Sequence, residues 1–187
     1  MDKTIARALK YLGFKGTATE EQVLMVESAI MEIKQVARPA CLHTFYKLHK
    51  TSEGVYYIDG ELNLDYKSTK GLFDKGESEL LCILVSTIGP AVDKRIAKYK
   101  DLEPSRMVLL DACASSYVEE ITDSYQAKLN LKGETFRYAP GYGDVPLTMQ
   151  REIFNLMPEI SRIGIELDET NFMHPFKSMT GLIGFKK

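Results

Sequence analysis

The strongest chemical signal in the sequence is a short loop, Arg-Tyr-Ala-Pro-Gly-Tyr-Gly-Asp, at residues 137–144. An arginine such as Arg137 can bind a carboxylate through two parallel hydrogen bonds. Gly141 lets the backbone approach a ligand closely, and Tyr142 can stack on a flat ring. These residue types together suit a small zwitterionic ligand. The alternative is a structural turn, in which Asp144 caps the helix that follows and the tyrosine packs on its flank.

Other reactive residue types give weaker signals. His43 and His49 lie on one face of a predicted strand, but they are too far apart to hold a metal ion without further ligands. Three cysteines form no Cys-x-x-Cys pair, which argues against a disulfide framework and against a structural zinc site. The sequence also contains no recognisable acid–base pair. We therefore predict neither a metal site nor a catalytic residue.

Composition excludes several classes of partner. The 187 residues include 24 Lys+Arg and 26 Asp+Glu, so the basic surface expected of a nucleic-acid-binding protein is missing. The longest uncharged run, residues 80–92, is shorter than the roughly 20 residues that cross a bilayer. Charged residues among the first ten interrupt any apolar core of a signal peptide. We expect a cytoplasmic protein with no nucleic-acid or membrane partner.

Helical spacing of apolar residues predicts the elements that position the loop. Thr19 and Gln22 form a capping box at the start of the second helix, and Pro104 opens the longest one. Ser68 is expected to cap its own short helix. The predicted helices cover residues 5–12, 20–37, 68–75, 90–99, 104–129 and 146–157.

Strand patterns fill the remaining sequence. The continuous apolar run at 80–86 is typical of a strand buried on both faces, and Asp59-Gly60 predicts a tight turn between two strands. The predicted strands cover residues 42–49, 55–58, 61–64, 80–86, 135–138, 163–167 and 179–185. We predict one α+β domain over 1–187, an antiparallel or mixed sheet with helices packed around it. Its N-terminal helical part is 1–40, and 41–187 hold the mixed sheet and helices.

The loop at 137–144 carries an Arg-x-x-x-Gly-Tyr motif and resembles the activation domain of cobalamin-dependent methionine synthase. The run Met-His-Pro-Phe-Lys-Ser-Met-Thr-Gly at 173–181 matches the family's Met-x-Pro…Ser-x-x-Gly block. The resemblance is strongest over 130–185 and continues colinearly over 1–129. Further features similar to small stand-alone members are Tyr11-Leu12-Gly13-Phe14, Arg38-Pro39, Thr87-Ile88-Gly89 and Leu110-Asp111-Ala112.

The resemblance implies a function in methionine biosynthesis. In this family the domain binds S-adenosylmethionine and presents it to cobalamin held by another module. When the cobalamin has been oxidised to cob(II)alamin, one electron and the sulfonium methyl group restore methylcobalamin. The protein then supplies orientation within a methyltransferase system, while the corrinoid supplies the chemistry. The implied partner is a cobalamin-dependent methionine synthase that lacks its own activation domain, or another corrinoid protein.

The resemblance also implies a set of cofactor-binding residues, namely Glu119, Arg137, Ala139, Gly141 and Tyr142. In the family the arginine binds the methionyl carboxylate, the alanine and glycine provide backbone contacts, and the tyrosine lines the adenosyl site. The glutamate, on the long helix, binds the ligand's amino group, and Glu120 is the alternative match. The alternative for both glutamates is that they bind no ligand and lie on a helix face exposed to solvent.

A second function hypothesis comes from chain length. The full-length activation domain is much longer than 187 residues and provides further ligand contacts. The alternative is therefore a non-catalytic binding module that docks on a corrinoid protein without S-adenosylmethionine-dependent remethylation.

Overall fold

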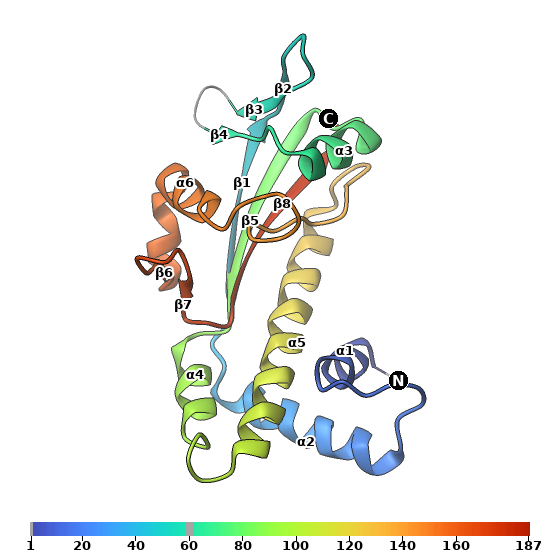
Figure 1. The fold of residues 1–187 in the computed structure, drawn as a ribbon, viewed down its shortest axis with the longest axis vertical. Coiled ribbons are helices and arrows are strands. Elements are labelled where there is room, and N and C mark those ends of the chain that lie inside the picture. Colours follow the sequence, from blue (N-terminus) through green and yellow to red (C-terminus); the bar gives the residue numbers. More distant parts are fainter. Residues whose placement is uncertain (1, 59–61) are drawn as a thin grey trace.

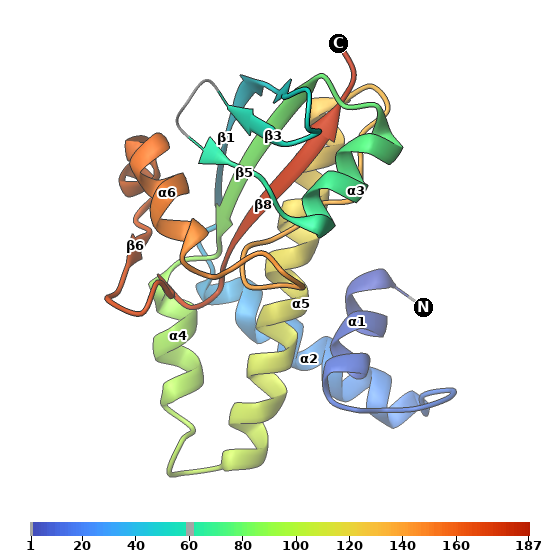
Figure 2. The same ribbon diagram turned by 45° about the horizontal axis from the view of Figure 1, so that its top comes forward.

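The computed structural model describes residues 2–58 and 62–187, and it combines a three-stranded antiparallel sheet with a helical end (Figure 1). The sheet order is β1 (Ala40–Lys47), β5 (Leu80–Thr87) and β8 (Ser178–Phe185), and both neighbouring pairs are antiparallel. Helix α5 (Pro104–Leu129) extends from the sheet into the helical end (Figures 1 and 2). The predicted α+β class, with helices packed around an antiparallel sheet, is confirmed.

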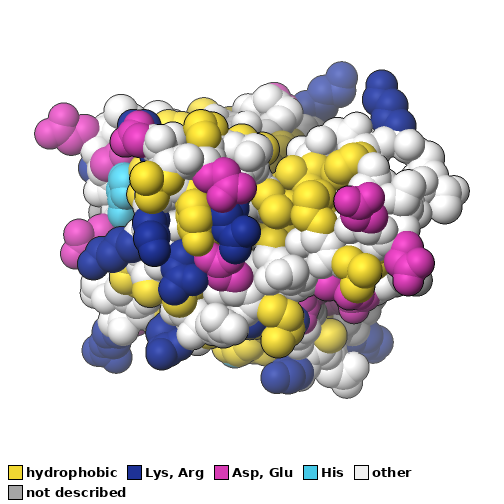
Figure 3. Space-filling model, turned by 90° about the horizontal axis from the view of Figure 1, so that it is seen from below, with side chains coloured by type: hydrophobic (Ala, Val, Ile, Leu, Met, Phe, Trp, Pro, Cys, Tyr) yellow, Lys and Arg dark blue, Asp and Glu magenta, His cyan; other side chains and the backbone are white. Residues whose placement is uncertain are grey.

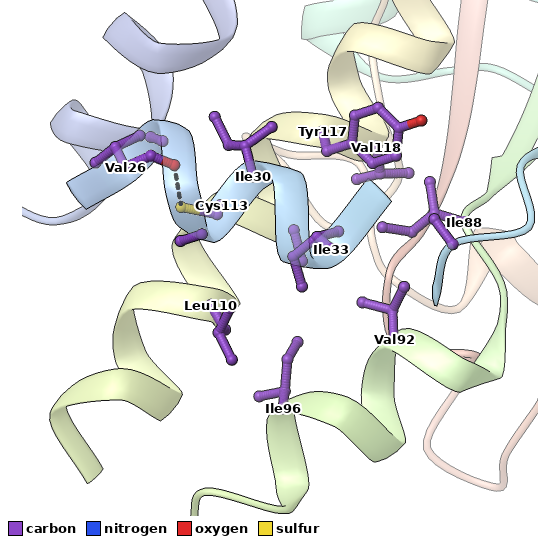
Figure 4. Close-up of a cluster of buried hydrophobic side chains, with 14 of the residues drawn as sticks. Val26, Ile30, Ile33, Ile88, Val92, Ile96, Leu110, Cys113, Tyr117 and Val118 are labelled. Carbon is purple, nitrogen blue, oxygen red and sulfur yellow. Dashed lines mark hydrogen bonds between the residues drawn. The ribbon is translucent and has the colours of Figure 1, made fainter. Parts of the chain in front are cut away.

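The helical end is held together by one apolar core (Figure 4). Three further helices, α1 (Lys3–Tyr11), α2 (Glu20–Val36) and α4 (Pro90–Ala97), pack against α5. The predicted capping box opens α2: the backbone N–H of Gln22 donates to Thr19 Oγ1 at 3.3 Å, and the Thr19 N–H donates to Gln22 Oε1 at 2.9 Å. Local sequence therefore sets the start of α2, and burial of its apolar face positions it. The labelled core residues in Figure 4 are Val26, Ile30, Ile33, Ile88, Val92, Ile96, Leu110, Cys113, Tyr117 and Val118.

Strand β5 is buried on both faces, as its continuous apolar run predicts. Leu81 and Ile83 pack into a cluster with α3 (Lys67–Gly76), α6 (Met149–Leu156) and the 3₁₀ helix η1 (Pro158–Ile163). Cys82 and Leu84 point to the opposite face, where the last turns of α5 cover them. Alternate side chains of a strand lie on opposite faces, so this one strand joins both sides of the core.

Shorter strands form two further antiparallel sheets. One contains β2 (His49–Lys50), β3 (Tyr56–Ile58) and β4 (Leu62–Asn63), and the other pairs β6 (Glu166–Leu167) with β7 (Met173–His174). The turn predicted at Asp59-Gly60 lies outside the described residues. The strand predicted over 163–167 is wrong at its start, because η1 extends to Ile163 and Gly164 then reverses the backbone at φ +74°.

The strand predicted at 135–138 is also wrong. Only the two ends of this segment bond to β8: the Thr135 N–H donates to the Gly184 carbonyl at 2.8 Å, and Tyr138 forms an isolated bridge with Leu182. Between them, Phe136 points outward and is 79% exposed. The alternation of residue types resembles a strand, but the segment leaves the sheet edge between its two anchor points.

Asp144 caps a different helix from the one expected. Its carboxylate accepts the backbone N–H groups of Lys67 at 2.6 Å and Ser68 at 3.2 Å, so it caps the start of α3. Ser68 does not cap this helix, since Tyr66 occupies the N-cap position. The helix after Pro146 begins only at Met149, without a side-chain cap. A residue 76 positions away in the sequence thus replaces the local cap that the sequence indicates.

The helical end, seen from below in Figure 3, carries patches of hydrophobic side chains between charged ones. Exposed apolar residues on its helices and connections include Phe14, Met25 and Leu102. None of the helices in the described part of the chain is long and apolar enough to cross a membrane.

Candidate functional site

A cleft of about 610 Å³ opens along one side of α5. Its other walls are the end of α1, Ile96 of α4, Tyr142 and the residues that lead into β8. The polar residues that line it and enter the argument below are Tyr11, Asp111, Ser115, Glu119, Tyr142 and Lys177. A second pocket of about 400 Å³ shares Glu119 with the cleft and contains Asp123 and Arg137. The two cavities adjoin at Glu119, and together they are called the groove below.

The periodicity of α5 explains why the two cavities adjoin. Asp111, Ser115, Glu119 and Asp123 are spaced four residues apart, so neighbouring side chains lie close together and the row winds by about 120° around the helix. At 1.5 Å per residue, the distance from the first to the last of them along the helix axis is about 18 Å. This row presents three carboxylates and a hydroxyl, from Asp111 in the cleft to Asp123 in the second pocket.

Arg137 lies at one end of this groove and is only 13% exposed. Its Nη2 donates to Asp123 Oδ1 at 2.9 Å, and its Nη1 donates to Gln126 Oε1 at 2.7 Å. The side chain reaches α5 by crossing β8 at Gly181, where an added Cβ would lie 2.4 Å from Arg137 Cγ and Cδ. The glycine that ends the Ser-x-x-Gly block therefore makes room for the arginine that begins the Arg-x-x-x-Gly-Tyr motif.

Asp123 is the centre of an ion-pair cluster at this end. Besides Arg137, it accepts Arg7 Nη2 at 2.9 Å and Lys3 Nζ at 3.0 Å. Burial alone would raise the pKa of Asp123, but the hydrogen bonds from these three cations outweigh it and lower the pKa to about 2. The carboxylate is consequently ionised at neutral pH and holds both guanidinium groups in place.

Glu119 lies where the two cavities meet. It accepts a hydrogen bond from the Tyr11 hydroxyl, and its Oε2 lies 3.0 Å from Arg7 Nε. Burial, followed by the bond to Glu119, raises the pKa of Tyr11, so this phenol stays protonated and remains a donor. The alternative, Glu120, accepts from Thr4 at 2.8 Å and lies 3.5 Å from Lys34. The structure therefore brings Glu119 to the groove and directs Glu120 to the packing between α5 and the first two helices.

The glycine-containing loop presents Tyr142 to the cleft. Gly141 has φ +89°, and its N–H donates to the Val145 carbonyl at 2.9 Å. The Ala139 carbonyl accepts the Tyr142 N–H at 3.4 Å, and the Tyr138 hydroxyl donates to the Tyr142 carbonyl at 2.9 Å. Tyr142 itself is 69% exposed. Ala139 and Gly141 thus lie in the turn that supports the tyrosine rather than on the lining of the cleft.

Four polar residues of the cleft, Tyr11, Asp111, Ser115 and Lys177, were not among the sequence candidates. Lys177 is 12% exposed, and its Nζ lies 2.8 Å from Asp111 Oδ1 and donates to Ser115 Oγ at 2.9 Å. Tyr11 closes the cleft from the side of α1. The four-residue spacing of Asp111 and Ser115 from Glu119 could have identified both helix residues. Tyr11 and Lys177 lie within the runs that resemble the family, but no spacing relates them to Glu119, because they approach from opposite ends of the chain.

The remaining candidates do not assemble a reactive centre. The two histidines that sequence places on one strand are separated, because β1 ends at Lys47 and His49 belongs to β2. His43 Nδ1 lies 2.9 Å from the Tyr125 hydroxyl. Burial raises the pKa of the Cys82 and Cys113 thiols to about 12, so neither is a ready nucleophile. Within residues 2–58 and 62–187 no three His, Cys, Asp or Glu side chains are grouped to hold a metal ion.

Comparison with known proteins matches this architecture. A family model described as vitamin B12 dependent methionine synthase, activation domain, matches residues 65–187. The chain belongs to this family. The match covers the loop, α5 and both sequence blocks described above, whereas α1 and α2 lie before it.

Solved structures extend the fold similarity beyond that match. A crystal structure of the MetH reactivation domain bound to AdoHcy aligns with 97% of this chain and 75% of that one, with a TM-score of 0.59. At 12% sequence identity the alignment shows the fold. A search of curated protein sequences gave no significant match.

Proposed function

We propose that this protein binds S-adenosylmethionine in the groove along α5 and uses it to support reactivation of a cobalamin-dependent methionine synthase. Membership of the activation-domain family supports the general role. The similar reactivation domain was solved with AdoHcy, which is the molecule left when S-adenosylmethionine has given up its methyl group. The observation that carries the proposal is the row of polar side chains on α5, which runs from the cleft to the adjoining pocket of Arg137.

The groove has chemistry for both ends of such a ligand. At one end, Arg137 can bind the methionyl carboxylate, and Glu119 can bind the amino group. At the other end, Tyr142 offers a ring face for the adenine, and Asp111 offers carboxylate oxygens for hydroxyl donors. The sulfonium then lies between carboxylates of α5, which favour its positive charge.

Binding and orientation are the tasks of this chain in the reaction. The corrinoid, held by the partner protein, would supply the nucleophile that takes the methyl group, with one electron from an external reductant. No side chain has to donate or accept a proton, because the sulfonium leaves as a neutral thioether. With the carboxylate at Arg137 and the adenine at Tyr142, the sulfonium would lie in the cleft close to Tyr11 and Glu119. Positioning of this kind can contribute several powers of ten to a rate.

We also propose the finer features of this role. The partner is a methionine synthase without its own activation domain, or another corrinoid protein. Residues 1–187 act as one domain, since α5 contributes to both the helical core and the sheet core. The three cysteines are free thiols, which is typical of a reducing compartment such as the cytoplasm.

Calorimetry with S-adenosylmethionine and S-adenosylhomocysteine tests the proposal. We expect both to bind the isolated protein, and we expect Arg137→Ala to weaken both while the protein stays folded, because Asp123 keeps Arg7 and Lys3. Recovery of methyl transfer by oxidised methionine synthase on addition of the protein and a reductant is the functional readout.

The same measurements separate the alternative function. A docking module would bind the corrinoid protein in a pull-down experiment. In calorimetry it would give no heat of binding with S-adenosylmethionine or S-adenosylhomocysteine, whether or not the partner is present. Equal affinity of the parent and Arg137→Ala would refute the carboxylate role of this arginine.

A further inference from the structure

Two arginines from distant parts of the chain meet at one carboxylate. Arg7 Nη2 lies 2.9 Å from Asp123 Oδ2, and Arg137 Nη2 lies 2.9 Å from Asp123 Oδ1. Both side chains are mostly buried, with 17% and 13% exposed, and both line the 400 Å³ pocket. Asp123 therefore brings the two guanidinium groups together, one at each carboxylate oxygen.

The pair has unused capacity for an anion. A guanidinium has five N–H donors on three nitrogens. Among the described residues, Arg137 engages Nη1 and Nη2, and Arg7 engages Nε and Nη2. This leaves Arg137 Nε and Arg7 Nη1 without a protein partner. In the ion-paired cluster, three cations (Lys3, Arg7 and Arg137) face two carboxylates.

We propose that Arg7 is a second cation of the ligand's carboxylate site, acting beside Arg137. The inference rests on the proposed function, and it assigns a ligand contact to α1, outside the residues 65–187 that the family model matches. Arg7 and Arg137 flank one carboxylate, so a ligand carboxylate entering the pocket meets both guanidinium groups. Glu134 also lines the pocket, but it is exposed and binds Gln126.

The competing explanation is that Arg7 only fastens α1 to α5. Both roles predict some loss of stability when the side chain is removed, so melting temperature alone does not decide. The deciding readout is the preference for a ligand carboxylate. S-Adenosylhomocysteine and its decarboxylated amine share the adenosine, the sulfur and the amino group, and they differ only in the carboxylate that Arg7 would bind.

The experiment measures the affinity of both probes for the parent, Arg7→Gln and Arg7→Lys. We expect Arg7→Gln to weaken S-adenosylhomocysteine at least tenfold and the amine less than twofold. Arg7→Lys, which keeps the charge but not the planar fork, should give an intermediate loss and remains informative if Arg7→Gln does not fold. Lys10→Gln is the matched control, because Lys10 is an exposed cation on the same helix.

Each outcome decides between the explanations. An unchanged ratio of the two affinities in a folded Arg7 variant overturns the carboxylate role and leaves Arg7 as a packing residue. A parent protein that binds S-adenosylhomocysteine but does not prefer it to the amine also overturns it, while the proposed function stands. A parent that binds neither probe refutes the proposed function itself.

Discussion

Replacing Gly181 by alanine tests whether the two sequence blocks meet as the structure shows. The new Cβ would lie 2.4 Å from Arg137 Cγ and Cδ. Unbonded carbon atoms prefer separations of about 3.5–4.0 Å, so the arginine stem has to move by about 1 Å or more. The stem cannot move without pulling the guanidinium away from Asp123 and Gln126. Gly181→Ala should therefore displace Arg137 without changing it chemically.

The size of the effect follows from the bonds that are lost. A hydrogen bond to a charged group is worth about 1.5–3 kcal/mol, which corresponds to a loss of about 10- to 150-fold in affinity for a ligand carboxylate. Overpacking should also lower the free energy of unfolding by about 1–3 kcal/mol. Calorimetry with S-adenosylhomocysteine measures the first effect, and denaturant unfolding measures the second.

A double-mutant cycle with Arg137→Ala makes the test specific. Once the arginine side chain is gone, the methyl group at position 181 has room, so the double variant should bind no more weakly than Arg137→Ala alone. Gly71→Ala in α3 is the control, because nothing lies within 4 Å of its Cβ position. Additive losses of affinity, or an affinity of Gly181→Ala within twofold of the parent, would refute the contact-based reasoning.

Three further predictions follow from other contacts. The pKa of Asp123 is lowered from 3.8 to about 2, which stabilises the folded state above pH 4 by about 2 kcal/mol. This stabilisation is lost as the pH falls from 4 towards 2. Measured by urea unfolding, the stability of Asp123→Asn should therefore fall less over this pH range than that of the parent. Asp144→Ala should lower the melting temperature, because two backbone N–H groups of α3 lose their acceptor, and Asp144→Asn should restore part of the loss. The isolated protein should purify without stoichiometric corrinoid, because the sequence has no Asp-x-His-x-x-Gly signature of a corrinoid-binding module; a red-orange absorbance at one equivalent would contradict this.

Elements with strong local signals are predicted well from the sequence. The capping box of Thr19 and Gln22 gives the start of α2, and Pro104 gives the start of α5. The apolar run from Leu80 gives a strand buried on both faces. In each case a local feature, such as a cap, a proline or a run of apolar residues, agrees with the tertiary packing.

The errors occur where a distant residue decides the local structure. Asp144 has the chemistry of an N-cap and acts as one, but its helix lies 76 positions earlier in the chain. The segment before Arg137 has the residue types of a strand, yet β8 bonds only its two ends. Sequence periodicity indicates which residues can cap a helix or pair with a strand, but it does not identify the distant helix or strand that they contact.

The same limit applies to the site. Glu119 and Tyr142 line one cleft, and their contact with a ligand stays a prediction, as do the backbone contacts of Ala139 and Gly141. Arg137 lies in the adjoining pocket and already binds Asp123. No spacing pattern relates Arg7 or Tyr11 to the site, although Tyr11 belongs to the family-like run at 11–14, because their side chains reach the site only when α1 packs against α5.

The bond between Asp144 and α3 has a consequence for how a ligand arrives. Because this carboxylate and the contact of Gly141 with Val145 hold both halves of the loop, the backbone around Tyr142 is ordered by folding itself. Binding a ligand then fixes the backbone of few further residues. Each residue fixed on binding would otherwise cost about 1–2 kcal/mol of conformational entropy. We therefore expect the proposed ligand to meet a preformed surface, so that its association is limited by encounter and side-chain adjustment rather than by closure of a loop.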